Sequence, residues 1–179
     1  MIVSNKLRFI FLKTRKTAGS SIQVALSTVC DPLMDIITGS NIQDGTLDES
    51  HSSGWNMGKF CTKHPHPPIS QIRKWAGDGW NNYWKFAFVR NPFDIVVSRY
   101  HWNVKGKRKG KETSKSGFTE WVRTYISSGE YKHDLQYPYI CNNKNEIDVN
   151  FVGRYEKIEE HYKYVCKRIG LDTVPELGF

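Results

Sequence analysis

The chain has 179 residues, a length typical of one domain, and we expect residues 1–179 to form a single domain. Hydrophobic residues make up 39% of the chain and charged residues 25%, a globular composition that excludes intrinsic disorder. The net charge of +8 favours an anionic ligand, but it does not distinguish nucleic acid, anionic lipid, a polyanionic glycan and a phosphorylated nucleotide.

Apolar patterning in the first half predicts a strand, a loop and a helix. Leu7 to Lys13 is a short apolar run of the kind that a buried parallel strand shows, and Thr14 to Gly19 is a tight polar loop. Ser20 is the expected cap of the helix that follows. Asp31 to Lys59 lacks periodicity and reads as a mostly irregular connection.

The rest of the chain continues the alternation of strands with helices. The further predicted elements are a short helix over 69–75, a strand over 85–89, a helix from Pro92, a helix over 118–126, a strand over 147–155 and a helix over 156–169 with Gly170 as its C-cap. Strands that alternate with helices predict an α/β fold with a parallel sheet.

The segment Lys13–Ser21 (KTRKTAGSS) lies between a predicted strand and a predicted helix, where open α/β sheets bind ligands. Free amides and the helix dipole favour an anion there, and Gly19 lets a phosphate approach the backbone. The segment also supplies hydroxyl donors at Ser20 and Ser21 and positive charge at Arg15 and Lys16. An ordinary capped helix after a basic loop is the structural alternative.

A P-loop kinase or NTPase is the functional rival for this loop. Such enzymes normally carry G-x-x-x-x-G-K-[ST]. Here no glycine stands at the front, and Lys16 precedes Gly19 instead of following it. The order of these residues argues against a Walker A loop.

A second motif covers residues 86–102 and reads FAFVRNPFDIVVSRYHW. Arg90 ends the predicted strand, and Ser98 lies about two helical turns beyond it. The planar fork of arginine matches phosphate oxygens, so we expect Arg90 and Ser98 to hold one phosphate together.

Taken together, the two segments resemble the sulfotransferases that use 3′-phosphoadenosine-5′-phosphosulfate (PAPS), and most of all the carbohydrate sulfotransferases of the heparan sulfate 2-O-sulfotransferase kind. That family also has a lysine-containing 5′-phosphosulfate loop first and an Arg-Asn-Pro…Ser motif later. Phe151 to Glu156 (FVGRYE) is similar to a late strand–helix element of the family. The resemblance leaves out residues 31–59, and it implies a P-loop-like three-layer fold with a central parallel sheet flanked by helices.

The resemblance also implies roles for individual residues. Lys16 would contact the bridging oxygen of the donor and stabilise the leaving phosphate, Arg90 and Ser98 would hold the 3′-phosphate, and Tyr155 would lie near the nucleotide. The 5′-phosphate would be cradled by Arg15, Lys16, Thr17, Ala18, Gly19, Ser20 and Ser21. Arg99 and Arg154 read instead as plain surface or helix residues.

Sulfuryl transfer needs a base for the acceptor hydroxyl, and a histidine suits that role. The candidates are His64 and His66 in the sequence KHPHPP, which the prolines favour as an extended segment. The family's base is a histidine between its two phosphate motifs, which leaves both residues open. Solvated histidines on a proline-stiffened surface loop are the alternative.

We therefore expect a PAPS-dependent sulfotransferase that forms adenosine 3′,5′-bisphosphate and uses no metal. The acceptor would be a hydroxyl of a glycan or another small anionic molecule. The basic loop Lys105–Lys115 would either meet such an acceptor or be a solvated loop. A non-catalytic binding module for PAPS or nucleic acid is a further alternative, although we expect no nucleic-acid partner.

Cysteines and hydropathy bear on the cellular setting. The four cysteines, Cys30, Cys61, Cys141 and Cys166, are scattered without zinc-type spacing, so we expect free thiols. We find no signal peptide and no apolar run approaching the roughly 20 residues that cross a bilayer. The sequence predicts a cytoplasmic protein without a membrane span.

Overall fold

The computed structural model describes residues 1–31, 33–38, 42–43, 46–47, 66–105 and 117–178. Its main element is a five-stranded sheet with the order β3-β1-β2-β6-β7. The bounds of these strands are Ile36–Ile37 (β3), Ile2–Ser4 (β1), Phe9–Leu12 (β2), Trp84–Val89 (β6) and Phe151–Arg154 (β7). The predicted strands over 7–13, 85–89 and 147–155 thus become β2, β6 and β7.

The sheet is parallel only in its centre, so the prediction of a parallel sheet is partly wrong. β2 pairs with β6 and β6 with β7 in parallel, whereas β1 is antiparallel to both β2 and β3. β1 and β2 are joined by Asn5–Arg8, and so short a link permits only a hairpin because a parallel crossover needs about a dozen residues.

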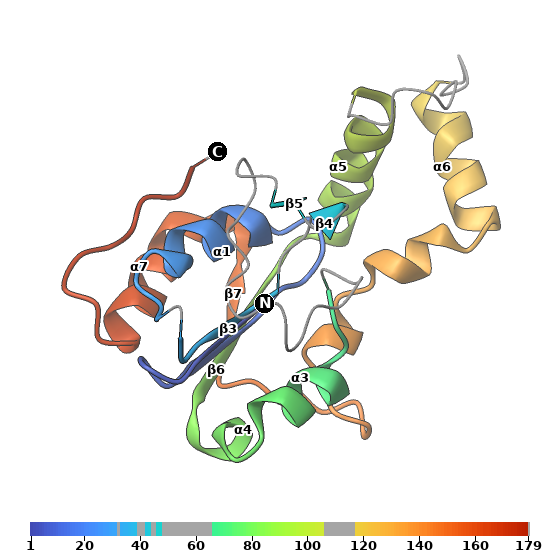
Figure 1. The fold of residues 1–179 in the computed structure, drawn as a ribbon. Coiled ribbons are helices and arrows are strands. Elements are labelled where there is room, and N and C mark those ends of the chain that lie inside the picture. Colours follow the sequence, from blue (N-terminus) through green and yellow to red (C-terminus); the bar gives the residue numbers. More distant parts are fainter. Residues whose placement is uncertain (32, 39–41, 44–45, 48–65, 106–116, 179) are drawn as a thin grey trace.

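Helices cover both faces of this sheet (Figure 1). On one face, Phe9, Phe11, Phe86 and Phe88 pack against α1 and α7. On the other, Ile10, Leu12 and Ala87 pack against α3 and α4. The bounds of these helices are Gly19–Ser27 (α1), Ile69–Ala76 (α3), Gly79–Asn82 (α4) and Ile158–Arg168 (α7). Alternate residues of β2 and β6 therefore enter two cores, and the expected three layers are present.

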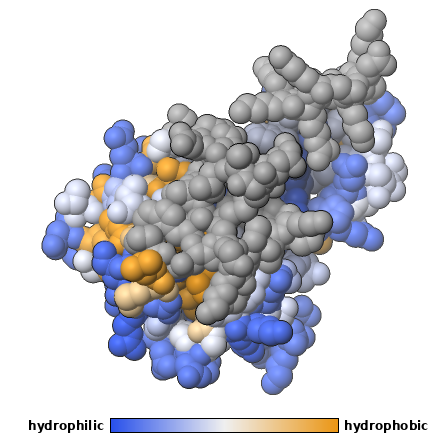
Figure 2. Space-filling model, viewed as in Figure 1, coloured by the Kyte–Doolittle hydropathy of each residue, from blue (hydrophilic) through white to orange (hydrophobic). Residues whose placement is uncertain are grey.

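A second pair of helices, α5 (Pro92–Lys105) and α6 (Phe118–Ser127), extends away from the sheet as an arm (Figure 1). Aromatic rings join them: Tyr100 packs edge-on against Phe118 and Trp121, and Trp121 stacks on Tyr125. On the face in Figure 2, hydrophobic residues gather over the sheet region, whereas this arm is mostly hydrophilic. Three short 3₁₀ helices follow, η1 (Glu130–Asp134), η2 (Tyr137–Tyr139) and η3 (Tyr155–Lys157).

Two helix ends test the predicted caps. Ser20 is not the cap of α1, because the helix begins at Gly19 and Ala18 precedes it in a left-handed conformation. Gly170 does end α7: its φ is 83°, its N–H donates to the Lys167 carbonyl and the Leu171 N–H donates to the Cys166 carbonyl. This is the Schellman arrangement that glycine favours.

The segment 31–59 is not wholly irregular. It contains β3 and a small antiparallel pair, β4 (Ile42–Gln43) with β5 (Thr46–Leu47). Of the four cysteines, Cys30, Cys141 and Cys166 are free thiols, and Cys61 lies outside the described residues.

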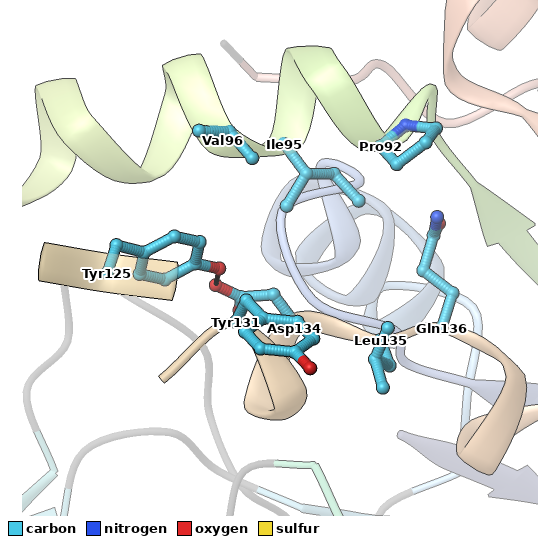
Figure 3. A pocket seen from close by; sticks show the side chains of 8 residues that line it. All are labelled: Pro92, Ile95, Val96, Tyr125, Tyr131, Asp134, Leu135 and Gln136. Atoms are coloured by element: carbon cyan, nitrogen blue, oxygen red, sulfur yellow. Dashed lines mark hydrogen bonds between the residues drawn. The ribbon is translucent and has the colours of Figure 1, made fainter. Parts of the chain in front are cut away.

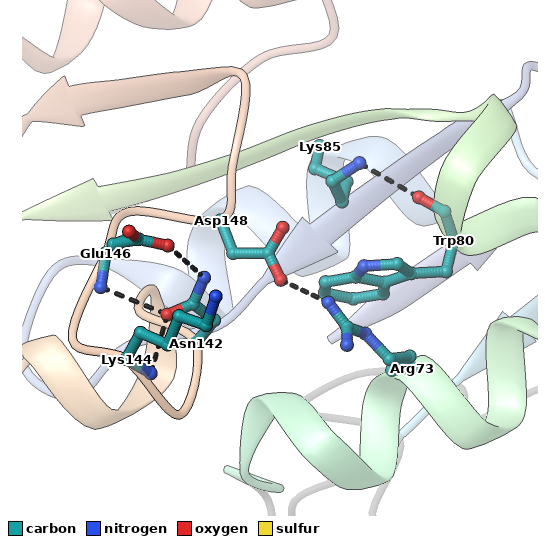
Figure 4. Close-up of polar contacts among 7 residues, drawn as sticks. All are labelled: Arg73, Trp80, Lys85, Asn142, Lys144, Glu146 and Asp148. Atoms are coloured by element: carbon teal, nitrogen blue, oxygen red, sulfur yellow. Dashed lines mark hydrogen bonds and ion pairs between the residues drawn. The ribbon is translucent and has the colours of Figure 1, made fainter.

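A polar network joins α3, α4 and β6 to the loop before β7 (Figure 4). Arg73 pairs with Asp148 at 2.5 Å, and the Lys85 ammonium donates to the Trp80 carbonyl at 2.9 Å. Both cations also lie near the Trp80 ring, at 5.1 Å and 5.3 Å from its centroid. These contacts hold α3 and α4 against the sheet near the start of β6.

Within the described part of the chain, no helix is long and apolar enough to cross a membrane.

Candidate functional site

The predicted phosphate loop leaves the carboxyl end of β2 and enters α1. Lys16 and Ala18 both have positive φ, 58° and 55°, which is uncommon for residues with a side chain. Backbone that alternates between left- and right-handed conformations turns successive N–H groups toward one concavity, which is the arrangement found in anion-binding nests. Thr14 ties the loop to the sheet, because its hydroxyl donates to the Phe88 carbonyl and shares a hydrogen bond of 2.8 Å with the Thr17 hydroxyl.

Gly19 is required by the packing of this loop. A Cβ at this position would lie 2.7 Å from Cγ of Lys13. The Lys13 side chain cannot move aside easily, since it is 5% exposed, and burial lowers its pKa to about 8. Of the two serines, Ser20 is exposed in the first turn of α1 and Ser21 is half-buried. The glycine is thus explained by its packing against Lys13, whereas its role toward a phosphate stays a prediction.

Lys16 is half-buried at the edge of the loop, and its ammonium lies 4.6 Å from the centroid of the Trp102 ring. Burial lowers the pKa of Lys16, Arg99 and Arg90 lower it further, and Asp134 raises it. These cations crowd one place, and an anion bound there would relieve their repulsion.

Arg90 brings the second motif to the loop. Its Nη1 donates to the Lys16 carbonyl at 3.3 Å, and its guanidinium lies 4.0 Å from the Tyr155 ring centroid. Its buried Nε has no hydrogen-bond partner among the described residues. A buried donor without a partner is costly, so the geometry suits an anion that accepts from Arg90. Ser98 is half-buried on α5, one turn before Trp102.

His66 reaches the loop from the segment before α3. Its Nδ1 lies 2.9 Å from the Lys13 carbonyl, and its ring meets Tyr139 edge-on at 6.2 Å between centroids. A carbonyl oxygen only accepts, so Nδ1 carries the proton and Nε2 keeps a lone pair. Burial lowers the pKa of His66 to about 3, which keeps the imidazole neutral at pH 7. The other candidate base, His64, lies outside the described residues.

One segment that sequence reasoning missed contacts each cationic part of the site. The Gln136 amide bonds both backbone groups of Arg90 at 2.7 Å, and the Tyr139 hydroxyl accepts from Nε of Arg15 at 3.1 Å. Asp134 pairs with Arg99. These partners are between 35 and 124 residues apart in sequence, and no local motif marks them.

Arg99 is not the plain surface residue that its sequence setting suggests. Its Nε donates to Oδ2 of Asp134 at 2.7 Å and its Nη2 donates to Oδ1. The Tyr125 hydroxyl donates to the same carboxylate at 2.6 Å, and the Asp134 side chain is only 4% exposed. This pair joins α5, α6 and η1 into one unit.

A pocket of about 150 Å³ lies under α5, beside this pair (Figure 3). Its walls are mainly aliphatic and aromatic, and Asp134 and Gln136 are already engaged by protein partners. The lining residues are Pro92, Ile95, Val96, Tyr125, Tyr131, Asp134, Leu135 and Gln136. The pocket therefore adjoins the cationic site but offers mostly apolar surface.

Comparison with known proteins indicates the family of the chain. The sequence profile of the sulfotransferase family matches residues 1–178. An uncharacterized protein of Archaeoglobus fulgidus is 33% identical over 107 residues, which cover 58% of this chain and 82% of that protein. Carbohydrate sulfotransferase 10 of Xenopus laevis is 21% identical over 96% of this chain, which spans only 53% of the Xenopus protein.

The comparisons support the broad resemblance drawn from the two motifs. The narrower likeness to heparan sulfate 2-O-sulfotransferases stays a prediction. Because the family profile runs from β1 past α7 and includes both segments that meet at Arg90, the chain belongs to the sulfotransferase family.

Proposed function

We propose that this protein transfers a sulfuryl group from PAPS to a hydroxyl group of a carbohydrate. The observation that carries this proposal is the hydrogen bond from Arg90 to the Lys16 carbonyl. It brings together the two segments whose residues would bind the two phosphate-bearing ends of PAPS. The unpartnered Nε of Arg90 and the nest at Lys16 and Ala18 support it.

In this proposal the site works by position and charge. The loop from Arg15 to Ser21, including Lys16, Thr17, Ala18, Gly19 and Ser20, cradles the 5′-phosphate. Arg90 and Ser98 hold the 3′-phosphate, and Tyr155 lies beside the nucleotide. The 3′-phosphate distinguishes this donor from ADP and ATP, so Arg90 sets the choice of nucleotide.

The transfer step needs a base and a stabilised leaving group. The acceptor oxygen bonds to sulfur as the bond between sulfur and the bridging oxygen breaks, and the electron pair stays on the departing 5′-phosphate. Lys16 stabilises that charge, and adenosine 3′,5′-bisphosphate leaves. Nε2 of His66 takes the hydroxyl proton, and His64 is the alternative base.

Replacement of Lys16 tests the chemistry directly. We expect Lys16→Ala to lower transfer of isotopically labelled sulfate from PAPS by about 10²–10³-fold, because removal of a group that stabilises developing charge costs that much. The exposed Lys74 on α3 supplies the control, and Lys74→Ala should leave transfer unchanged. Equal rates for both variants would refute the role of Lys16.

Trp102 supports a carbohydrate acceptor. Its side chain is 55% exposed although its ring contacts Lys16, so an apolar platform stands open beside the reacting group. Sugar rings pack on such aromatic faces. Similarity to carbohydrate sulfotransferase 10 points the same way. The basic loop Lys105–Lys115 lies almost entirely outside the described residues.

We expect Trp102→Ala to raise the KM for a glycan acceptor about tenfold and to leave the affinity for adenosine 3′,5′-bisphosphate within about twofold. Loss of one aromatic contact of about 1–1.5 kcal/mol corresponds to such a factor. Phe93, 79% exposed on the opposite side of α5, provides the matched control. If Phe93→Ala raises the acceptor KM as much, Trp102 has no special role.

A further inference from the structure

Arg99 lies next to Lys16 by the geometry of α5. Trp102 follows Arg99 by three residues and Ser98 by four, and residues at these spacings are neighbours on a helix surface. The Trp102 ring also holds the Lys16 ammonium at 4.6 Å. Ser98 and Arg99 therefore share one face of α5 with Trp102, whose ring contacts Lys16.

Asp134 fixes the direction of the Arg99 guanidinium. It occupies the edge formed by Nε and Nη2, and the Tyr125 hydroxyl holds the carboxylate in turn. A bidentate pair of this kind sets the plane of the guanidinium, so that its Nη1 side is the one available to a second anion. Arg99 is only 19% exposed, and its orientation is consequently restricted.

The side chains around Lys16 carry a net positive charge, which favours a bound anion. Arg99 lowers the pKa of Lys16 more than Arg90 does, and Asp134 acts in the opposite direction. Asp134 balances only one of the three cations at this place. The remaining positive charge suits the phosphosulfate end of the donor.

We propose that Arg99, held in place by Asp134, is a third cationic residue of the donor site and binds the 5′-phosphosulfate end beside Lys16. This inference rests on the proposed function, because it assigns a role toward the same donor. It predicts that Arg99 recognises the 5′-phosphate, whereas Arg90 recognises the 3′-phosphate.

Two ligands separate these roles. Adenosine 3′,5′-bisphosphate carries both phosphates, and adenosine 3′-monophosphate lacks the 5′-phosphate. Replacing Arg99 alone would leave a buried carboxylate without its partner, so the test variant is the double change Arg99→Met with Asp134→Asn. This variant keeps the net charge of the site, and any loss of affinity therefore reports the missing contact.

By calorimetry, we expect the double variant to bind adenosine 3′,5′-bisphosphate about tenfold more weakly and adenosine 3′-monophosphate within about twofold of wild type. Arg123→Met removes an exposed arginine of α6 as the control, and should change neither affinity.

An unchanged affinity of the double variant for the bisphosphate would overturn the proposal, and so would equal losses for both ligands, which indicate a structural role. If the double variant does not fold, Arg99→Lys provides the test. This variant keeps the positive charge but lacks the planar guanidinium, and it should lose affinity severalfold for the bisphosphate alone. Unchanged binding by Arg99→Lys would also overturn the proposal. Failure of wild type to prefer the bisphosphate over ADP would instead refute the proposed function.

Discussion

At the scale of single residues, one hydrogen bond determines which nitrogen of His66 carries the proton. The Lys13 carbonyl fixes the proton on Nδ1 and leaves Nε2 as the acceptor. Burial, which lowers the pKa to about 3, keeps this acceptor unprotonated far below neutral pH. The histidine is therefore unprotonated, as a base must be, and an anion bound beside the loop would raise its pKa.

The same shift makes His66 a source of acid sensitivity. The unfolded chain takes up this proton near pH 6.5 and the folded chain only near pH 3, so the free energy of unfolding falls as pH drops through that window. One such group changes stability by at most about 1.4 kcal/mol per pH unit.

We expect His66→Gln to be less sensitive to acid between pH 6 and pH 4 than wild type, because glutamine can still donate to the Lys13 carbonyl but does not titrate. Urea unfolding of both proteins at several pH values measures the difference. The variant should also lose about 10²–10⁴-fold in sulfuryl transfer. Parallel stability curves would contradict the buried, neutral state, and full transfer activity would remove His66 as the base.

The residues of the site divide by whether a local pattern marks them. Lys16 and Arg90 were predictable because each sits where a strand gives way to a helix. Asp134, Gln136 and Tyr139 were not, since each contacts a cation of the site that lies at least 35 residues away in sequence. Ser20 was mistaken for a helix cap because the left-handed turn at Ala18 has no reliable signature in a residue with a side chain.

At the scale of elements, the strands that follow apolar runs were predictable and the short edge strands were not. β2 and β6 bury residues on both faces, and β7 packs its partly buried Phe151 and Val152 against the two cores. β1 and β3 have three and two residues, too few to show the alternation of apolar and polar residues that marks a strand. The antiparallel edge follows from the short Asn5–Arg8 link, which becomes informative only once β1 is known.

The pairing of β6 with β7 depends on a glycine. Gly153 lies opposite Phe88, and a Cβ there would come within 2.6 Å of the Phe88 ring. Phe88 is fully buried in the core against α1 and α7 and has little room to move. The close approach of the two strands therefore requires a residue without a side chain.

We expect Gly153→Ala to lower the free energy of unfolding by about 1–3 kcal/mol, the usual cost of overpacking a core. Gly178→Ala is the matched control, because a Cβ there meets nothing within 4 Å and should change stability by less than about 0.5 kcal/mol. Chemical denaturation of the two variants measures this. Equal stabilities would mean that the contact between β6 and β7 can accommodate an added methyl group.

At the scale of the whole molecule, the sheet and the arm have separate tasks. The sheet ends at the phosphate loop and at Arg90, while α5 carries Ser98, Arg99 and Trp102, and η1 supplies the Asp134 partner of Arg99. The segment from Asp134 to Tyr139 crosses between them and contacts both. The proposed donor site takes residues from both parts. Donor binding should therefore stabilise the entire fold.

The most direct test is a thermal unfolding titration with adenosine 3′,5′-bisphosphate, alongside ADP and AMP at matched concentrations. We predict a rise in Tm that is largest for the 3′,5′-bisphosphate and is lost in Arg90→Ala, because in the proposed function Arg90 holds the 3′-phosphate that ADP and AMP lack. At a ligand concentration of about 100 Kd the gain in stability is about 2.7 kcal/mol. An equal rise with ADP, or no rise with any nucleotide, would contradict the PAPS-dependent function.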